Sequence, residues 1–247
     1  MIVVRALTKS YGRKEVLRGV SFVAQPGESF VYGYGTDILG CVVERASGMA
    51  LDALIASRIT GPLGMVDTHF FLPAGKRERL TAVYSSTEDG GMQRAPEGAR
   101  GQGHYVDGPR RSFAGGAGLV STARDYARFL QMLINGGELD GVRLLSPVTV
   151  KYMASDHLRA DTKFSGVTTL PLGTGFGLGF AVRNDTGRFE VVGNAGEYFW
   201  AGAAGTGFYV DPKHGIVCVW MTQGQPGMAR RYDRYLFKQM VYQALVK

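Results

Sequence analysis

Tyr32 is the side chain whose sequence neighbourhood best suits proton transfer. It follows a turn at Pro26-Gly27 and precedes a segment of helical periodicity that starts at Thr36. A phenol just before a helix N-terminus lies at the positive end of the helix dipole, which favours the phenolate. With a cation nearby to lower its pKa further, such a tyrosine can act as a general base. The alternative is a tyrosine that packs in the core.

A strand edge with almost no side chains is the second feature that could take part in chemistry. Trp200 is followed by three small residues, Ala201, Gly202 and Ala203. Where side chains are this small, a ligand can approach the backbone N–H groups closely. Trp200 would then form one wall of the site. The alternative for Trp200 is an aromatic side chain that only packs at the end of its strand.

Helices and an antiparallel sheet are predicted to position these residues. Residues 1–24 read as a β-hairpin, and residues 73–112 read as a long excursion over the surface. Periodicity, capping residues and stop signals predict helices over 36–48, 50–59, 122–135, a short stretch from 146, and 230–246. Apolar runs predict strands over 177–183, 188–192, 202–210 and 216–222, with a turn at 212–215.

Two details of these helices are specific enough to be checked. Thr122 is the expected N-cap of its helix, and Leu236, Met240 and Ala244 form an apolar stripe on the last one. Helices followed by a meander and one final helix favour an α+β fold in which helices pack against an antiparallel sheet.

The composition argues against several classes of function. The 247 residues carry a formal net charge of +7, but no basic stripe interleaves with aromatic residues, so we expect no nucleic-acid partner. No segment approaches the ~20 apolar residues of a membrane span, and the N-terminus lacks a signal sequence. We therefore expect a cytoplasmic protein without a membrane partner. The four histidines are far apart, so we expect no metal and no cofactor. Cys41 and Cys218 sit in apolar runs typical of buried, reduced thiols.

Four colinear segments resemble class C-type serine β-lactamases and the carboxylesterases related to them. The first runs from Pro26-Gly27 through Tyr32 and reads QPGESFVYGYGTDILG. The others are GGAGLVSTARDYARFLQMLINGGELDGVRLLSP, GTGFGLGFAV, and Trp200-Ala201-Gly202, where the esterases often carry Trp-x-Gly. The lactamases place Asn two residues after the tyrosine, so Tyr34 favours the esterase branch. The resemblance covers roughly residues 22–247.

The resemblance implies a β-lactamase/transpeptidase-like fold and acyl transfer through a serine ester intermediate. Tyr32 would be the general base, and the backbone N–H of Ala203 would be one oxyanion donor. Tyr34, Trp200 and the Ala201-Gly202 backbone would contact the substrate, a small-molecule ester or amide.

The nucleophile of this family is absent from the sequence. It lies in a Ser-x-x-Lys motif, and no Ser or Thr of this chain has Lys three residues later. The closest match, Ser121 with Arg124, offers a guanidinium that stays protonated. We therefore expect the chain to lack the nucleophile helix and to be inactive as it stands. The alternative is a non-catalytic, ligand-binding remnant of the fold. An uncovered apolar surface would favour self-association in either case.

Residues 1–21 resemble the opening strands of ABC-transporter ATPase domains. No phosphate-binding Gly-x-x-x-x-Gly-Lys-Ser/Thr follows them, so ATP binding is not expected. We interpret the chain as an N-terminal hairpin remnant over 1–21 and a partial serine hydrolase domain over 22–247, joined in a chimeric or truncated reading frame.

Overall fold

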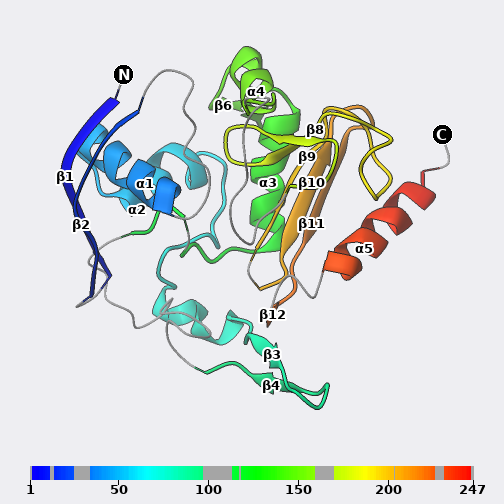
Figure 1. The fold of residues 1–247 in the computed structure, drawn as a ribbon, viewed down its shortest axis with the longest axis horizontal. Coiled ribbons are helices and arrows are strands. Elements are labelled where there is room, and N and C mark those ends of the chain that lie inside the picture. Colours follow the sequence, from blue (N-terminus) through cyan, green and yellow to red (C-terminus); the bar gives the residue numbers. More distant parts are fainter. Residues whose placement is uncertain are drawn as a thin grey trace. The chain divides into compact units, whose positions relative to one another are not determined.

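Two compact units make up the chain in the computed structural model, which describes residues 2–11, 14–24, 34–96, 113–116, 118–158, 170–202, 204–225 and 231–245. The first unit comprises residues 1–61, 67–80 and 97–121, and the second comprises residues 62–66, 81–96 and 122–247. Each unit has its own set of helices and strands (Figure 1).

The first unit combines a β-hairpin with helices. Its described elements are β1 (Ile2–Tyr11), β2 (Lys14–Ala24), α1 (Tyr34–Ser47), α2 (Leu51–Ile55), the π-helical turn η1 (Ala56–Thr60) and the 3-10 helix η2 (Ala74–Arg79). The antiparallel pairing of β1 with β2 confirms the hairpin expected for residues 1–24. Helix α1 ends where expected, because Gly48 has a φ of 68°, the left-handed conformation that glycine adopts at helix ends.

Helix α1 packs against a glycine-rich loop. A Cβ on Gly115 would lie 2.0 Å from the carbonyl oxygen of Thr36, so only glycine allows this approach. The Gly116 N–H donates to Asp37 Oδ1 at 2.9 Å and ties the loop to the first turn of the helix. Within this helix Leu39 is exposed and Cys41 is buried, as expected for a thiol in an apolar run.

The second unit is built on a five-stranded antiparallel sheet with the order β11-β10-β9-β8-β7. Its strands are β7 (Thr174–Phe176), β8 (Ala181–Arg183), β9 (Tyr198–Ala201), β10 (Gly207–Asp211) and β11 (Ile216–Trp220). The turn at 212–215 joins β10 to β11 as predicted. The strand predicted over 202–210 is only partly right. β10 begins at Gly207, and the residues between Ala201 and Gly207 connect it to β9, because the chain reverses after Gly202.

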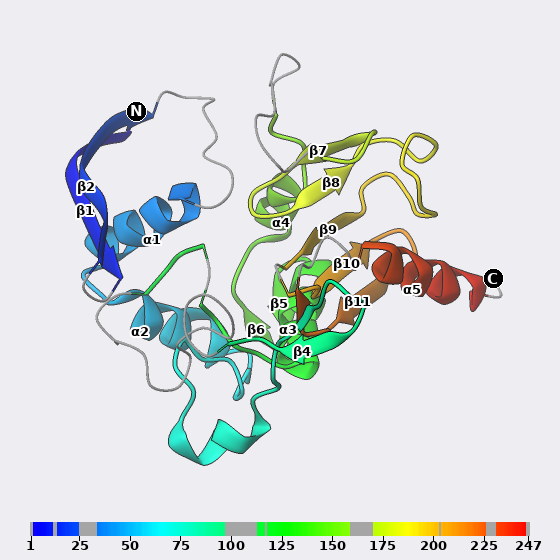
Figure 2. The ribbon, with the colours of Figure 1, turned by 60° about the horizontal axis from the view of Figure 1, so that its bottom comes forward.

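Helices cover both faces of this sheet. Helix α3 (Ala123–Ile134) lies on one face and α5 (Arg231–Gln243) on the other (Figures 1 and 2). Tyr126 of α3 contacts Phe208 edge-on, with ring centroids 5.4 Å apart, whereas the next residue, Tyr209, stacks on Tyr242 of α5. Successive strand residues therefore serve opposite helices, as the two-residue period of a β-strand requires. This arrangement is the predicted α+β architecture.

The face of α5 that packs on the sheet is not the predicted one. Leu236 and Met240 of the apolar stripe are exposed, Met240 at 59%. The buried face carries Lys238, which is only 5% exposed, together with the rings of Phe237 and Tyr242.

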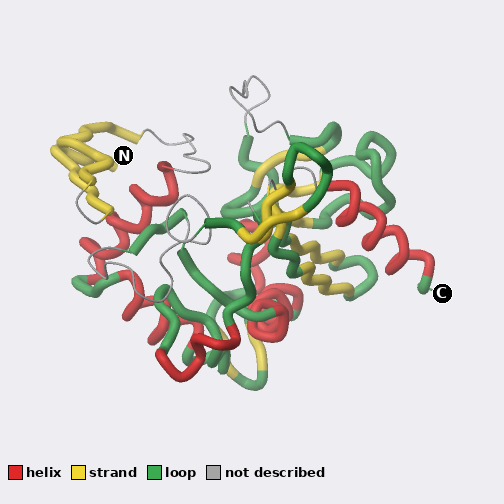
Figure 3. Tube along the Cα trace, turned by 90° about the horizontal axis from the view of Figure 1, so that it is seen from below, coloured by secondary structure: helices red, strands yellow, loops and turns green. Residues whose placement is uncertain are grey.

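The strand predicted over 188–192 is wrong. Residues 184–197 run as a loop between β8 and β9 (Figure 3). The alternation in this segment is real, because Phe189 and Val191 are buried. Phe189 stacks on Phe199 at 5.4 Å. The side chains thus pack on the sheet while the backbone has no neighbouring strand to pair with among the described residues.

Shorter elements complete the second unit. They are β3 (Tyr84–Ser86), β4 (Met92–Arg94), β5 (Glu138–Leu139), β6 (Val142–Arg143), α4 (Pro147–Met153) and β12 (Gly224–Gln225). β12 pairs parallel with β3, which pairs antiparallel with β4, so part of the predicted excursion is a small sheet. The expected N-cap is confirmed, because Thr122 accepts from the Asp125 N–H. Ser146 caps the short helix α4 in the same way and accepts from the Thr149 N–H.

Loss of the α3 cap should destabilise the second unit. Thr122→Ala removes the oxygen that satisfies the Asp125 N–H, so we expect a loss of about 1 kcal/mol in the free energy of unfolding, measured with urea. Thr122→Ser keeps the oxygen and is the control. Equal losses for both variants would show that the hydrogen bond does not stabilise α3.

Candidate functional site

Strand β9 carries the predicted Trp-x-Gly segment at its C-terminal end. Its pairing with β8 joins Tyr198 to Val182 and Phe199 to Ala181, and goes no further. Its pairing with β10 continues through Trp200 and Ala201. The last two residues of β9 are therefore bordered by a strand on one side only, within the described part of the sheet.

The hairpin after β9 fixes the direction of the backbone groups. Gly202 N–H donates to the Thr206 carbonyl at 2.9 Å, so Gly202 and Thr206 form a hydrogen-bonded pair. Hydrogen-bonded pairs alternate along an antiparallel ladder, so the N–H and C=O of Ala201 face away from β10, toward the side where β8 has ended. A Cβ on Gly202 would lie 2.1 Å from Thr206 Oγ1, so a larger residue here would force the Thr206 side chain to move.

Trp200 is held firmly from one side. It lies directly opposite Phe208 of β10 and meets Phe176 of β7 edge-on, with ring centroids 5.1 Å apart and planes at 90°. Its side chain is half-buried, while Ala201 beside it is exposed. Packing therefore explains part of the role of Trp200, and the remaining exposed surface is what a ligand could touch.

The other predicted site residues are only partly within the described structure. Tyr32 and Ala203 lie outside the described residues. Tyr34 is the first residue of α1, and only its backbone is described. Trp200, Ala201 and Gly202 are brought together at the end of β9. The role assigned to each of these six residues remains a prediction.

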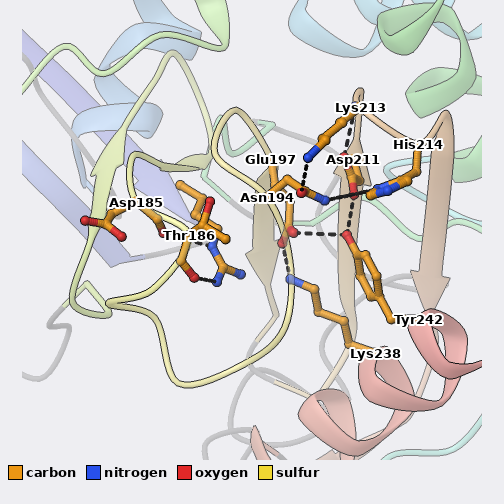
Figure 4. A network of polar contacts seen from close by, with 10 residues as sticks. Asp185, Thr186, Asn194, Glu197, Asp211, Lys213, His214, Lys238 and Tyr242 are labelled. Atoms are coloured by element: carbon orange, nitrogen blue, oxygen red, sulfur yellow. Dashed lines mark hydrogen bonds and ion pairs between the residues drawn. The ribbon is translucent and has the colours of Figure 1, made fainter.

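A buried ion pair lies directly behind β9 and was not predicted. Glu197, the residue before the strand, is fully buried and pairs with Lys238 of α5, as Figure 4 shows. Lys238 Nζ also lies 5.0 Å from the ring centroid of Tyr209. Arg183 is buried close to this pair, and its Nε and one Nη donate to the carbonyls of Asp185 and Thr186 at 3.0 and 2.6 Å.

A second buried carboxylate extends the network. Asp211, at the end of β10, accepts hydrogen bonds from the Tyr242 hydroxyl, Asn194 Nδ2 at 2.7 Å and the Lys213 backbone N–H at 2.9 Å. His214 Nδ1 lies 2.8 Å from the same carboxylate (Figure 4). These partners come from a loop, a turn and α5, so Asp211 ties three segments together.

Burial shifts the pKa values of these groups in different directions. It raises the pKa of Glu197 and lowers the pKa of Lys238, in each case against the attraction of the partner. Burial would also raise the pKa of Asp211, but hydrogen bonds from Tyr242, His214 and Asn194 outweigh it and hold that pKa below its ordinary value. The charged form of Asp211 is therefore the stable one in the folded chain.

The described residues hold no group of three or more His, Cys, Asp or Glu side chains that could bind a metal ion. None of the helices in this part of the chain combines the length and hydropathy that crossing a bilayer requires.

The sequence and fold match a known family over most of the chain. A family profile described as Beta-lactamase matches residues 11–240. The chain belongs to the beta-lactamase family. This confirms the resemblance and the fold class expected for residues 22–247, and the match begins inside the segment 1–21.

Several known proteins are similar to this chain. Protein Rv1367c of Mycobacterium tuberculosis is 35% identical over 218 residues, which cover 86% of this chain and 53% of that protein. Esterase EstB of Burkholderia gladioli is 31% identical over 211 residues, covering 80% and 50%. The structure of EstCE1, described as a hydrolase with promiscuous acyltransferase activity, superposes with a TM-score of 0.72 at 26% identity, covering 91% and 59%. The chain thus spans about half the length of the curated relatives it matches.

Breaking the buried ion pair should be costly in this beta-lactamase-family fold. Lys238→Met leaves Glu197 buried without its counter-charge, so we expect a loss of about 3–5 kcal/mol in the free energy of unfolding. Urea unfolding followed by tryptophan fluorescence measures it, because both tryptophans lie in the second unit. The double variant Glu197→Gln/Lys238→Met should lose less than Lys238→Met alone. A larger loss for the double variant would contradict this account.

Asp211 should make the second unit sensitive to acid. Because its folded pKa lies below the ordinary 3.8, its charge stabilises the fold above pH 3.8, and this contribution is lost as the pH falls below that value. Asp211→Asn should flatten the stability profile in this acid window. Glu197 affects stability in a different pH range. Because its pKa is raised in the folded chain, ionising it costs more there than in the unfolded chain, so its contribution lowers the free energy of unfolding as the pH rises above 4.5. If the free energy of unfolding of Asp211→Asn still falls as the pH drops below 3.8, the acid sensitivity comes from other carboxylates.

Proposed function

We propose that this chain carries part of the active site of a serine ester hydrolase or acyltransferase that works through an acyl-enzyme. The observation that supports this most directly is the end of β9, where the Ala201 backbone faces away from β10 beyond the last residue paired with β8. Backbone N–H groups at such a position can donate to the oxyanion of a tetrahedral intermediate. The names of the relatives EstB and EstCE1 support esters of small molecules as the substrate class.

The proposed roles follow the family pattern. Tyr32 takes the proton of the attacking hydroxyl and later activates the water or alcohol that releases the acyl group. Ala203 provides the oxyanion donor through its backbone N–H. Trp200, fixed by Phe176, borders the acyl or alcohol group, and Tyr34 contacts the substrate.

The serine nucleophile is not among these roles. Because no Ser or Thr is followed three residues later by Lys, we propose that the 247 residues alone do not turn over esters and that the nucleophile comes from outside them. Ser121 is not a substitute, because its hydroxyl lies 2.8 Å from Thr68 Oγ1 and Arg124 takes the place of the lysine. A non-catalytic fragment that binds acyl ligands at β9 is the second candidate, supported by the same open backbone.

A fluorophosphonate probe tests the absence of the nucleophile. We expect no mass increase when the folded, purified 247-residue chain is incubated with the probe, and no release of p-nitrophenol from p-nitrophenyl butyrate. EstB treated in parallel is the positive control. A stoichiometric adduct would overturn the proposal, and peptide mapping would then name the reactive serine.

A further inference from the structure

A cavity of about 360 Å³ lies in the first unit, and its described lining includes no residue of the strand edge discussed above. It is lined by Asp52, Ile55, Ala56, Thr60, Thr68, His69, Phe70, Phe71, Phe113 and Leu119. All of these described residues belong to the same unit. Its size is at the small end of the range of about 300–1,000 Å³ found for ligand pockets.

The walls of this cavity are held by hydrogen bonds. One wall is helical: Asp52, Ile55 and Ala56 are spaced three and four residues apart, so they share a face of α2 and η1. The opposite wall is an extended segment in which His69 and Val120 exchange both backbone hydrogen bonds, at 2.9 and 2.8 Å. The cavity is therefore formed before any ligand arrives.

Aromatic rings supply most of the apolar lining. Phe113 contacts Phe70 with ring centroids 5.1 Å apart and Phe71 with centroids 6.0 Å apart, both at steep interplanar angles. Gly118, which precedes Leu119, has a φ of 108°, a backbone conformation that suits glycine. Leu119, 45% exposed, lies at the rim. These side chains fit a compact apolar body.

One unpaired charge distinguishes the cavity. Asp52 is its only carboxylate, and it forms no hydrogen bond or ion pair with the described residues. The cations of η2 do not pair with Asp52: Arg79 and Lys76 pair with Asp67 at 2.8 Å and hold the pKa of that carboxyl far below its usual value. Lys76 Nζ also lies 3.2 Å from Nε2 of His69, a residue of the cavity wall.

We propose that this cavity binds a small organic cation, an ammonium group carried on an aromatic or branched aliphatic body. The ammonium pairs with the Asp52 carboxylate, and the body packs against Phe71, Phe113 and Leu119. Aromatic faces add a cation–π attraction that a neutral ligand lacks. An anionic ligand of the same shape is repelled by Asp52. This inference is independent of the ester chemistry proposed above, because it uses a different set of residues.

Three probes of one shape test the charge preference on the full chain. Saturation-transfer NMR and titration with benzylamine, benzyl alcohol and benzoate should show benzylamine binding at least fivefold more tightly than the alcohol, with no binding of benzoate. Equal binding of all three probes, or no binding of benzylamine, overturns the proposal without any variant.

Two matched substitutions test the residue assignment. Asp52→Asn should weaken benzylamine binding at least fivefold and leave benzyl alcohol unchanged, whereas Phe71→Leu should weaken both. Glu78→Gln removes an equal charge from an exposed residue of η2 that does not line the cavity, so it should change neither. If Glu78→Gln weakens benzylamine binding as much as Asp52→Asn does, the attraction comes from the overall surface charge, and the assignment of the site to Asp52 is wrong.

Discussion

The buried pair of Glu197 and Lys238 is the interaction on which the second unit depends. Glu197 directly precedes β9, and Lys238 lies at the centre of the buried face of α5, so one contact joins the middle of the sheet to the helix behind it. Neither charge has enough access to water to be solvated. The strand and the helix must therefore stay together for either charge to be tolerated, and a displacement of α5 would expose an uncompensated carboxylate.

Such a pair is a costly way to dock a helix, and its surroundings show how the cost is offset. The ammonium of Lys238 lies near the rings of Phe189, Tyr209 and Tyr242, whose faces attract cations. Tyr242 is one helical turn further along α5 and donates to Asp211, so the helix is bound to the sheet at two polar points. Two directional contacts fix the rotation of a helix about its axis, which apolar packing alone leaves loosely defined. This explains why Leu236 and Met240 remain outside.

Local signals predicted much of this fold, and tertiary contacts explain what they missed. The caps of α3 and α4, the end of α1 at Gly48 and the turn before β11 all depend on a few neighbouring residues, so the sequence displays them directly. Burial of Lys238 depends on Glu197, 41 residues away, and a lysine on a helix normally reads as a solvated side chain.

The wrong prediction of a strand over 188–192 also has a tertiary cause. Its alternating side chains are buried as a strand's would be, but pairing requires a neighbouring strand that periodicity cannot reveal. For the candidate site, the motif order located the Trp200 segment, whereas the open border of β9 follows from the length of β8, which no motif encodes.

The length of β8 also explains why the end of β9 has a strand on one side only. β8 has three residues and β9 has four, and the register places the missing partner opposite Trp200 and beyond. Unpaired strand backbone is a liability that proteins usually cover or protect with charged side chains. Here the small side chains of Ala201 and Gly202 do neither, and Ala201 is exposed. Trp200 packs on Phe176 and Phe208 beside this exposed backbone, so a rigid aromatic side chain and free strand backbone lie next to each other. This combination supports the proposal that a ligand binds at the end of β9.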